Sequence, residues 1–332
     1  MPRYGLRIRN PDGSSFIFNE RTTMSKILGS GSKGLTFGEW YTGIQVPVGH
    51  DYVLWLSSYA WINYNVSNSQ WVPSGYAYNQ PYLDGNRVLR VNSVNYNTAI
   101  PATHYGVFSW PQGHAPGRYG LRVNGKNNFS SISDVSYFSV LLWKGEVDIY
   151  NGWLPQAINS AFTMDRVVCF FYTTDQSKTI CMAPDPGDRV YKVWNVNGGQ
   201  SGGIIRAKVC IFGNGPIVKA KYGLQIRNSA GQVVYNSGTE IFAKPVLTSL
   251  ANLSLGQLRS VPGITRPMYA PSNIGALYSY PWQVDVWVSS NGYQLCPAWG
   301  WAKNQPKSHG PYTYYVSDIP ILSLDASDYF NF

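Results

Sequence analysis

One short pattern occurs three times along the chain and constrains its fold more than any other feature. It reads YGLRIRN at residues 4–10, YGLRVN at residues 119–124 and YGLQIRN at residues 222–228. In each copy apolar residues alternate with Gly, basic or amide residues. This period of two is typical of a half-buried β-strand with one apolar and one basic face. Because the copies begin 115 and 103 positions apart, we predict three tandem units.

The residues after copies one and three predict a hairpin. Asn10 is followed by Pro, Asp and Gly13, and Asn228 is followed by Ser, Ala and Gly231. In both copies a glycine ends a tight turn before a second apolar strand. We therefore predict an all-β fold of three tandem β-sandwich-like units joined by short Pro/Gly linkers. A unit near 110 residues can bury about 65% of its unfolded surface, enough for its own core. The units cover residues 1–117, 118–219 and 220–332, the last with an aromatic C-terminal extension.

The composition is rich in aromatic residues and poor in charge. Phe, Trp and Tyr make up 15% of the chain, and Asp, Glu, Lys and Arg make up 13%, about half the usual share of roughly 25%. So few charges predict that partner proteins or copies of the chain cover much of the surface. We expect the aromatic C-terminal extension to pack onto its own unit or onto a neighbouring subunit.

The net charge of +9 comes from a scarcity of acidic residues rather than from basic blocks. Nucleic-acid-binding proteins concentrate Lys and Arg on one face or arm, so the scattered pattern predicts no nucleic-acid partner. We favour attraction to an acidic surface, such as an anionic polysaccharide or the outside of a bacterium. No apolar run reaches membrane length, and no signal peptide follows Met1, which predicts cytoplasmic synthesis without membrane insertion. The four cysteines lack metal-binding spacing and have apolar neighbours, so we expect buried, reduced thiols at Cys169, Cys181, Cys210 and Cys296.

No combination of residues indicates an enzyme. Glu146 and Asp148 lie two positions apart on one predicted strand. We favour a solvent-facing edge with Val147 and Ile149 directed inward over a catalytic pair. The histidines have no metal-binding spacing, and the aspartates near the C-terminus, Asp325 and Asp328, lack the acidic density of a calcium loop. We therefore predict no catalytic residue, no cofactor and no metal.

Two stretches combine aromatic residues with Asn, Ser and Gln. Aromatic rings stack on the C–H faces of sugars while amides bind hydroxyl groups, so these stretches are candidate carbohydrate platforms. The same residue types fill sandwich cores and protein interfaces, the interpretation that we favour. The candidate contacts for carbohydrate or for a partner are Trp61, Trp71, Tyr76, Tyr78, Trp299 and Trp301.

The opening YGLRIRNPDG resembles bacteriophage tail proteins of the minor-tail and tail-fibre kind, which often begin with a YGLx(I/V)xNxxG hairpin. The resemblance covers about 20 residues in copies one and three, and copy two keeps only YGLRV. It implies a structural component of the virion tail, at the tail tip or in a tail fibre. Such a protein is made in the cytoplasm of the host bacterium and has no catalytic residues.

The resemblance also implies the partners. We expect other phage tail proteins and further copies of the chain in a homo-oligomer, with host-surface polysaccharide or another receptor as an additional ligand. The alternatives are a carbohydrate-binding, lectin-like module and a polysaccharide-degrading enzyme. Open aromatic grooves would favour the lectin, and aromatic residues buried in cores or interfaces would favour the structural protein.

Overall fold

The computed structural model describes residues 5–9, 15–19, 25–35, 38–58, 60–67, 70–78, 81–96, 100–112, 120–124, 129–133, 139–182, 190–196, 201–215, 224–228, 230–243, 245–279, 282–304, 313–318 and 320–332. In several strands, among them those at 5–9, 15–19, 60–67, 70–78, 120–124 and 129–133, this description covers the backbone alone.

The fold is almost entirely β, which confirms the predicted fold class. We call the three predicted units, residues 1–117, 118–219 and 220–332, the first, second and third ranges. The first range contains β1 (Gly5–Arg9), β2 (Ser15–Asn19), β3 (Lys26–Leu35), β4 (Gly38–Gln45), β5 (His50–Leu56), β6 (Ala60–Ser67), β7 (Gln70–Tyr78), β8 (Tyr82–Leu83), β9 (Val88–Tyr96) and β10 (Ile100–Pro111). The second contains β11 (Gly120–Asn124), β12 (Phe129–Ser133), β13 (Val140–Ile149), the 3-10 helix η1 (Pro155–Ala157), β14 (Val167–Tyr172), β15 (Lys178–Met182), β16 (Tyr191–Asn195) and β17 (Ile205–Gly213).

The third range continues the same class of structure. It contains β18 (Gln225–Arg227), β19 (Val233–Asn236), β20 (Val246–Thr248), β21 (Pro267–Tyr269), β22 (Gly275–Ser279), β23 (Trp282–Ser290), β24 (Leu295–Asn304), β25 (Thr313–Val316), β26 (Ile321–Asp325) and η2 (Ala326–Asp328). All the paired strands described are antiparallel, apart from one isolated parallel bridge.

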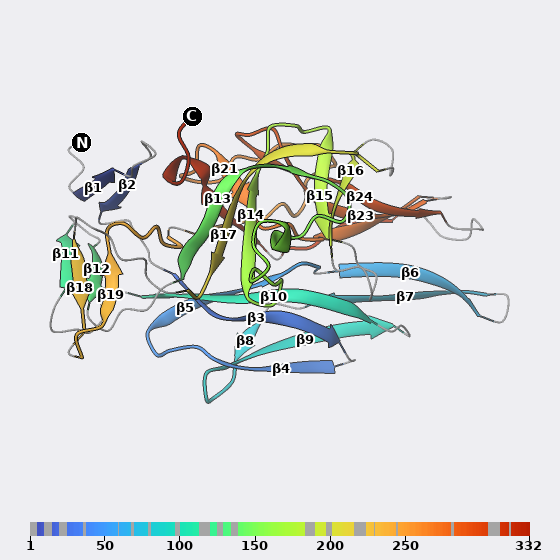
Figure 1. Cartoon of the computed structure of the whole chain (residues 1–332). Coiled ribbons are helices and arrows are strands. Elements are labelled where there is room, and N and C mark those ends of the chain that lie inside the picture. The colour runs from blue at the N-terminus through green and yellow to red at the C-terminus, as the bar shows by residue number, and fades with distance from the viewer. Residues whose placement is uncertain are drawn as a thin grey trace.

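Each copy of the repeated pattern forms the first strand of an antiparallel hairpin, as predicted for copies one and three. β1 pairs with β2, β11 with β12 and β18 with β19. In the third hairpin Ile226 is buried, whereas Gln225 and Arg227 are exposed, as the alternation of the sequence predicts. The three hairpins lie at one end of the molecule (Figure 1), where β2 contacts both β11 and β12.

The chain after each hairpin repeats one strand order. The first strand after the hairpin pairs with the last strand of its range, which also pairs with a strand from the middle of that range. The three resulting units are β3–β10–β5, β13–β17–β14 and β20–β26–β21. The last two join through Phe171 and Tyr269 into one six-stranded sheet. The sequence repeat is thus also a repeat of topology.

Backbone hydrogen bonds close the three repeats into a ring. Ser25, Ser139 and Phe242 each lie six positions after the second strand of their hairpin. The amide of Ser25 donates to the carbonyl of Phe242 (3.0 Å), that of Phe242 to Ser139 (2.9 Å), and that of Ser139 to Ser25 (3.1 Å). Head-to-tail contacts between like units generate a closed ring when they return to the starting unit. The chain therefore has an internal pseudo-threefold arrangement at the base of the hairpins.

Two hydrophobic clusters fill the spaces between the sheets, and β5 divides them. Val53 and Trp55 belong to the first cluster, and Leu54 and Leu56 belong to the second. Successive strand residues point to opposite faces of a sheet. The sheet of β3, β10 and β5 therefore has a core on each side. A five-stranded sheet, β4–β9–β7–β6 with β8 paired to β9, covers the second cluster through residues such as Trp40.

Phe242 lies at the centre of the first cluster. The centroid of its ring is 5.0 Å from that of Phe108, 5.6 Å from Phe170 and 5.2 Å from Phe212. Phe108 comes from the first range, Phe170 and Phe212 from the second, and Phe242 from the third. One cluster therefore joins all three repeats.

The expectation that each unit has a core of its own is therefore wrong, and three separate sandwiches are not confirmed. Strands of the second and third ranges share the six-stranded sheet, and the second cluster joins Leu54 of the first range to Val286 of the third. A repeat unit that cannot bury its apolar face alone covers it with its neighbours. The boundaries predicted at 117 and 219 lie outside the described residues and stay predictions.

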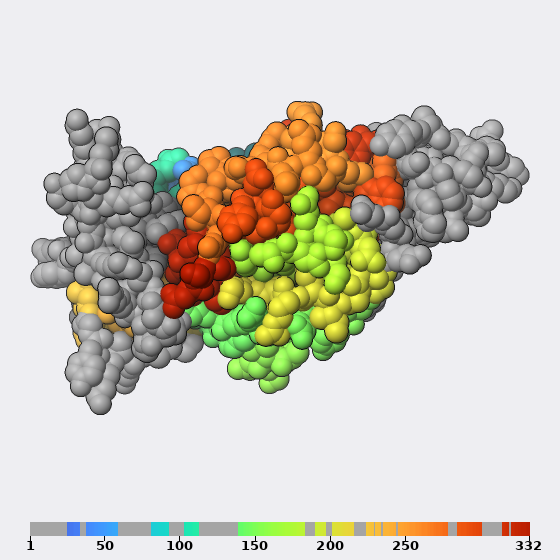
Figure 2. Space-filling view, turned by 90° about the horizontal axis from the view of Figure 1, so that it is seen from above, coloured from blue at the N-terminus to red at the C-terminus, as the bar shows by residue number. Residues whose placement is uncertain are grey.

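The aromatic C-terminal extension packs onto the chain itself, which confirms the expectation that it is not left in water. Tyr329 is buried, and its hydroxyl donates to the carbonyl of Ile241 (3.1 Å). The ring of Phe332 lies edge-on to Tyr172 with centroids 5.0 Å apart, and the Arg266 guanidinium carbon is 3.9 Å from the Phe332 centroid. The extension, dark red in Figure 2, thus covers strands of the second range as well as its own.

Candidate functional site

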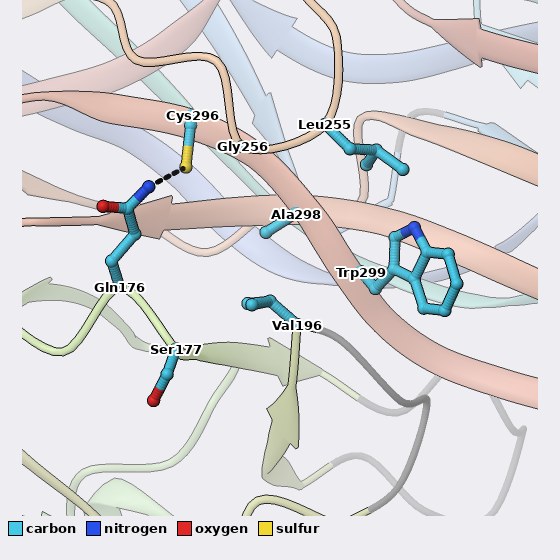
Figure 3. Close-up of a pocket in the computed structure, with 8 residues that line it drawn as sticks. All are labelled: Gln176, Ser177, Val196, Leu255, Gly256, Cys296, Ala298 and Trp299. Atoms are coloured by element: carbon cyan, nitrogen blue, oxygen red, sulfur yellow. Dashed lines mark hydrogen bonds between the residues drawn. The ribbon is translucent and has the colours of Figure 1, made fainter.

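A pocket of about 500 Å³ lies between the second and third ranges (Figure 3). This volume falls within the range of small-molecule sites. The lining residues come from β24, from the residues that flank the β15–β16 hairpin and from the loop before β21. They are Cys296, Ala298 and Trp299; Gln176, Ser177 and Val196; and Leu255 and Gly256.

Hydrogen bonds fix the walls of the pocket relative to one another. Thr179 Oγ1 donates to the carbonyl of Trp299 (2.8 Å), which lies 120 positions further along the chain. Ser289 Oγ donates to the carbonyl of Lys178 (2.8 Å). The amide of Gly256 donates to the carbonyl of Pro297 (2.8 Å) and holds the loop against β24. The pocket is therefore formed by packing between repeats and not within one repeat.

One end of the pocket is polar. Gln176 Nε2 lies 3.9 Å from the buried Sγ of Cys296, within the distance of a hydrogen bond to sulfur (Figure 3). Burial raises the pKa of the Cys296 thiol to about 11, so it carries its proton at neutral pH. Ser177 Oγ donates to Oδ1 of Asp175. Burial would raise the pKa of Asp175, but hydrogen bonds from Ser177 and Lys178 and the charge of Lys178 lower it overall. These groups can donate and accept hydrogen bonds, but the protonated thiol is a poor nucleophile.

The other end of the pocket is apolar. Trp299 and Leu255 lie there together (Figure 3), and both are half-buried against the second hydrophobic cluster. An aromatic face opposite an amide and a hydroxyl suits a small ligand with an apolar face and polar edges. A nucleophile–base pair is missing from the described lining residues.

Trp299 is the one predicted contact whose side chain the structure describes, and it lines this pocket. The backbone of the β6–β7 hairpin pairs Trp61 with Tyr76 and Trp71 with Val66. The other predicted side chains lie outside the described part of the structure: Trp61, Trp71, Tyr76, Tyr78 and Trp301.

The carboxylate pair on β13 forms a solvent-facing edge, as the sequence predicted. Asp148 Oδ1 lies 3.1 Å from Nη1 of Arg206, and Glu146 Oε1 lies 3.8 Å from its Nε. All three side chains are about half exposed, while Ile149 is buried. Near the C-terminus Asp325 accepts a hydrogen bond from the amide of Ser327 and caps η2. These carboxylates have structural partners.

All four cysteines are buried and lie outside any disulfide bond, as predicted. Burial raises the pKa of Cys169 to about 12, and it also raises the pKa of Cys210 well above its ordinary value. Within the described ranges no three His, Cys, Asp or Glu side chains are grouped closely enough to hold a metal ion. His114 and His309 lie outside these ranges. The described residues also contain no helix of the length and apolarity that crossing a membrane requires.

Sequence reasoning missed the polar end of the pocket. Gln176 and Ser177 precede β15 in a turn that no motif distinguishes. They meet Cys296 only because β15 packs on β24, and 120 positions separate Gln176 from that cysteine. Only the Trp-rich composition around Trp299 indicated a site in this region of the chain.

The hairpin end of the molecule is a second candidate, as a protein interface. On β18 the exposed Gln225 and Arg227 point away from the buried Ile226. The guanidinium of Arg227 donates to the carbonyl of Gly231 (2.7 Å), which holds its charge over the turn of the hairpin. The sequence places Arg9 and Asn124 at the positions equivalent to Arg227 in the other copies. Three strands with similar polar sequences therefore lie at one end.

A family model described as a family of unknown function (DUF6453) matches residues 5–281. The match includes all three copies of the repeated pattern apart from Tyr4, so the three hairpins belong to the matched region. No curated protein and no solved structure matches the chain significantly.

Proposed function

This chain belongs to DUF6453, a family of unknown function, and we propose that it is a structural component of a bacteriophage virion tail, at the tail tip or in a tail fibre. It works by binding other tail proteins and further copies of itself, and attachment to the host surface is an additional role. The resemblance of the opening hairpin to tail proteins supports the proposed place in a bacteriophage tail. The geometry of the hairpin end supports the mode of action.

The observation that carries this proposal is the gathering of three like hairpins at one end of the molecule (Figure 1). The ring of backbone hydrogen bonds through Ser25, Ser139 and Phe242 fixes their bases relative to one another. Like surfaces arranged about an axis are how symmetric assemblies form repeated contacts. A single chain that carries three such surfaces suits docking onto a symmetric partner, where each hairpin makes an equivalent contact.

The rest of the molecule supports binding rather than catalysis. The described pocket contains a protonated thiol, an amide and an aromatic ring, a combination that can hold a ligand but supplies no activated nucleophile. The low share of charged residues, 13% of the chain, is typical of proteins whose surface is covered by partners.

The first test is to purify phage particles from a lysate of cells that produce this chain and to identify their proteins by mass spectrometry. We expect the chain in intact particles and in isolated tails. A chain that stays in the soluble fraction, absent from particles that are otherwise complete, would overturn the tail assignment.

The second test concerns the hairpin end. The double variant Gln225→Glu and Arg227→Glu changes exposed side chains of β18 and should leave folding intact. We expect it to be incorporated into particles at least tenfold less than the parent chain. The matched control is Lys33→Glu, which also reverses an exposed charge but lies on β3. Equal incorporation of both variants would rule out the hairpin end as the assembly surface.

A further inference from the structure

Three side chains form a row across neighbouring strands of the five-stranded sheet. Arg90 on β9 is the register partner of Tyr41 on β4 on one side and of Tyr82 on β8 on the other. Register partners lie on the same face of a sheet. The tyrosines are 55% and 40% exposed, whereas Trp40 and Leu89, adjacent to the row in sequence, are buried on the opposite face. The row therefore faces outward.

The central guanidinium is held in one position. Arg90 Nη1 lies 2.8 Å from Oε2 of Glu39, and its Nη2 lies 2.9 Å from Oδ2 of Asp84. Asp84 is itself fixed, because its Oδ1 accepts hydrogen bonds from the amides of Asn86 and Val88, both at 2.9 Å. The turn after β8 thus positions the carboxylate that positions the arginine.

Both tyrosine rings are tied to this fixed group. The guanidinium carbon of Arg90 lies 4.5 Å from the ring centroid of Tyr41. The hydroxyl of Tyr82 donates to Oε1 of Glu39. This hydrogen bond lowers the pKa of Glu39 and raises that of Tyr82, so the carboxylate stays charged and the phenol keeps its proton. Exposed aromatic groups that are already ordered lose little entropy when a ligand binds.

The dimensions of the row suit linked sugar rings. Neighbouring strands are about 4.8 Å apart, so the backbone positions of Tyr41 and Tyr82, with β9 between them, are separated by roughly 10 Å. That separation is close to the length of two linked hexose units in an extended chain. Two rings at this spacing can stack on two sugars of one chain, with Arg90 and Glu39 beside them for the hydroxyl groups.

The charges of the row distinguish among ligand classes. Glu39, Asp84 and Arg90 give a formal charge of −1 in a chain whose total is +9, and each carboxylate already pairs with the guanidinium. An anion such as a nucleic acid or an acidic polysaccharide gains nothing here. The apolar surface of the row is limited to two rings, which is small beside the roughly 800 Å² per partner of a stable protein interface. A neutral saccharide is the class that remains.

We propose that the row of Tyr41, Arg90 and Tyr82 is a binding site for an extended, neutral polysaccharide. The two tyrosine rings stack on sugar faces, and the fixed guanidinium and carboxylate bind hydroxyl groups between them. This site lies outside the pocket at Trp299 and on residues that the assembly role does not use. This proposal does not depend on the proposed role in a phage tail, because binding of a saccharide can be measured on the isolated chain.

The test is saturation-transfer NMR followed by calorimetry on the purified chain, with cello-, chito-, malto- and manno-tetraose as probes. We expect at least one of these neutral tetrasaccharides to bind. Tyr41→Ala and Tyr82→Ala should each weaken that binding at least tenfold, while the ring-conserving Tyr41→Phe should keep it within about threefold. Tyr150→Ala and Tyr315→Ala are matched controls, since these tyrosines are 47% and 40% exposed elsewhere, and should bind like the parent.

Thermal unfolding of each variant separates lost binding from lost folding, and Tyr41→Phe keeps the test valid if an alanine variant unfolds. The proposal is overturned if none of the four probes binds, or if the double variant Tyr41→Ala/Tyr82→Ala binds as the parent does. It is also overturned if Trp299→Ala abolishes binding while the tyrosine variants keep it, because the pocket would then be the sugar site. Preference for an acidic oligosaccharide, lost with added salt, would contradict the neutral class.

Discussion

The amide of Ile27 donates a hydrogen bond to Oγ of Ser139 at 2.8 Å, although 112 positions separate the two residues. The Ser139 hydroxyl in turn donates to Oδ1 of Asn214 (2.7 Å), and the side-chain amide of Asn214 donates to the carbonyl of Ile27 (3.1 Å). One serine side chain thus joins β3 of the first range to both ends of the second. This network lies beside the backbone ring and couples the repeats where their hairpins begin.

Ser139→Ala should destabilise the chain by about 1–3 kcal/mol, because it leaves the buried amide of Ile27 without an acceptor. Urea denaturation followed by tryptophan fluorescence measures the change. Ser30→Ala is the matched control. Its hydroxyl also links two ranges, through the carbonyl of Asp165, but that hydrogen bond is exposed and water can replace it. A Ser139→Ala variant as stable as the control would show that the network does not couple the repeats.

Phe242→Ala should cost about 3–5 kcal/mol, since it empties the centre of a cluster to which all three ranges contribute. Because that core is shared, we expect one cooperative transition, with coincident curves from fluorescence and far-ultraviolet circular dichroism. Leu247→Ala, on a side chain that is 37% exposed in the same range, should change stability far less. Two or three separate transitions would instead indicate units that fold independently.

The hairpins were predictable because their determinants are local. In the third copy the amide of Asn228 bonds to the carbonyl of Gln232, and Gly231 adopts a φ of +77° that a glycine accepts without strain. The apolar run Val167–Tyr172 is also typical of a fully buried strand, and all six of its residues are buried in β14. Period and turn chemistry suffice for such elements.

The shared core and the pocket could not be predicted in this way. Both faces of β14 are covered, and no local pattern shows whether Phe170 meets its own repeat or Phe242 of the next one. The same applies to Trp299, which the sequence singled out, and to Gln176, which it did not. Both line one pocket only because sheets of different repeats pack together. The repeated sequence pattern predicts that the chain contains repeat units. It does not predict how they pack, because that depends on which neighbouring unit covers each apolar face.

The ion pair between Lys144 and Glu240 should stabilise the contact between the second and third ranges. Their charged atoms lie 2.8 Å apart, and the side chains are only 18% and 16% exposed. Lys144→Met leaves Glu240 largely buried without this partner and should cost about 2–3 kcal/mol, less than the loss for a fully buried pair. Glu240→Gln should cost a similar amount, and the double variant less than the two single changes combined.

The matched control for these Lys144 and Glu240 variants is the ion pair of Arg206 and Asp148. Its charged atoms lie 3.1 Å apart, but both side chains are more than half exposed. Arg206→Ala should change stability by no more than about 1 kcal/mol, because solvent screens the exposed pair. Chemical denaturation at two salt concentrations measures both pairs. Equal losses at the two sites would contradict the assigned difference in burial.

Buried thiols should make the chain less stable in alkaline solution. Burial raises the pKa of Cys169 to about 12 and of Cys296 to about 11, whereas an unfolded cysteine titrates near pH 8.5. The folded chain therefore keeps protons that the unfolded chain releases above that pH. The contribution of the buried thiols to stability is fully present below about pH 8.5. It is lost as the pH rises toward the pKa values of these thiols in the folded chain.

Urea midpoints should therefore be constant between pH 7 and 8 and fall between pH 9 and 10.5, and Cys296→Ala should make that fall shallower.

The burial of the thiols also predicts that a thiol reagent at pH 7.5 labels the native chain slowly and labels the denatured chain at all four cysteines. Cys296→Ala should then leave three labelled positions in the denatured chain. Rapid labelling of native Cys169 or Cys296, or a midpoint that rises above pH 9, would contradict the burial of these thiols.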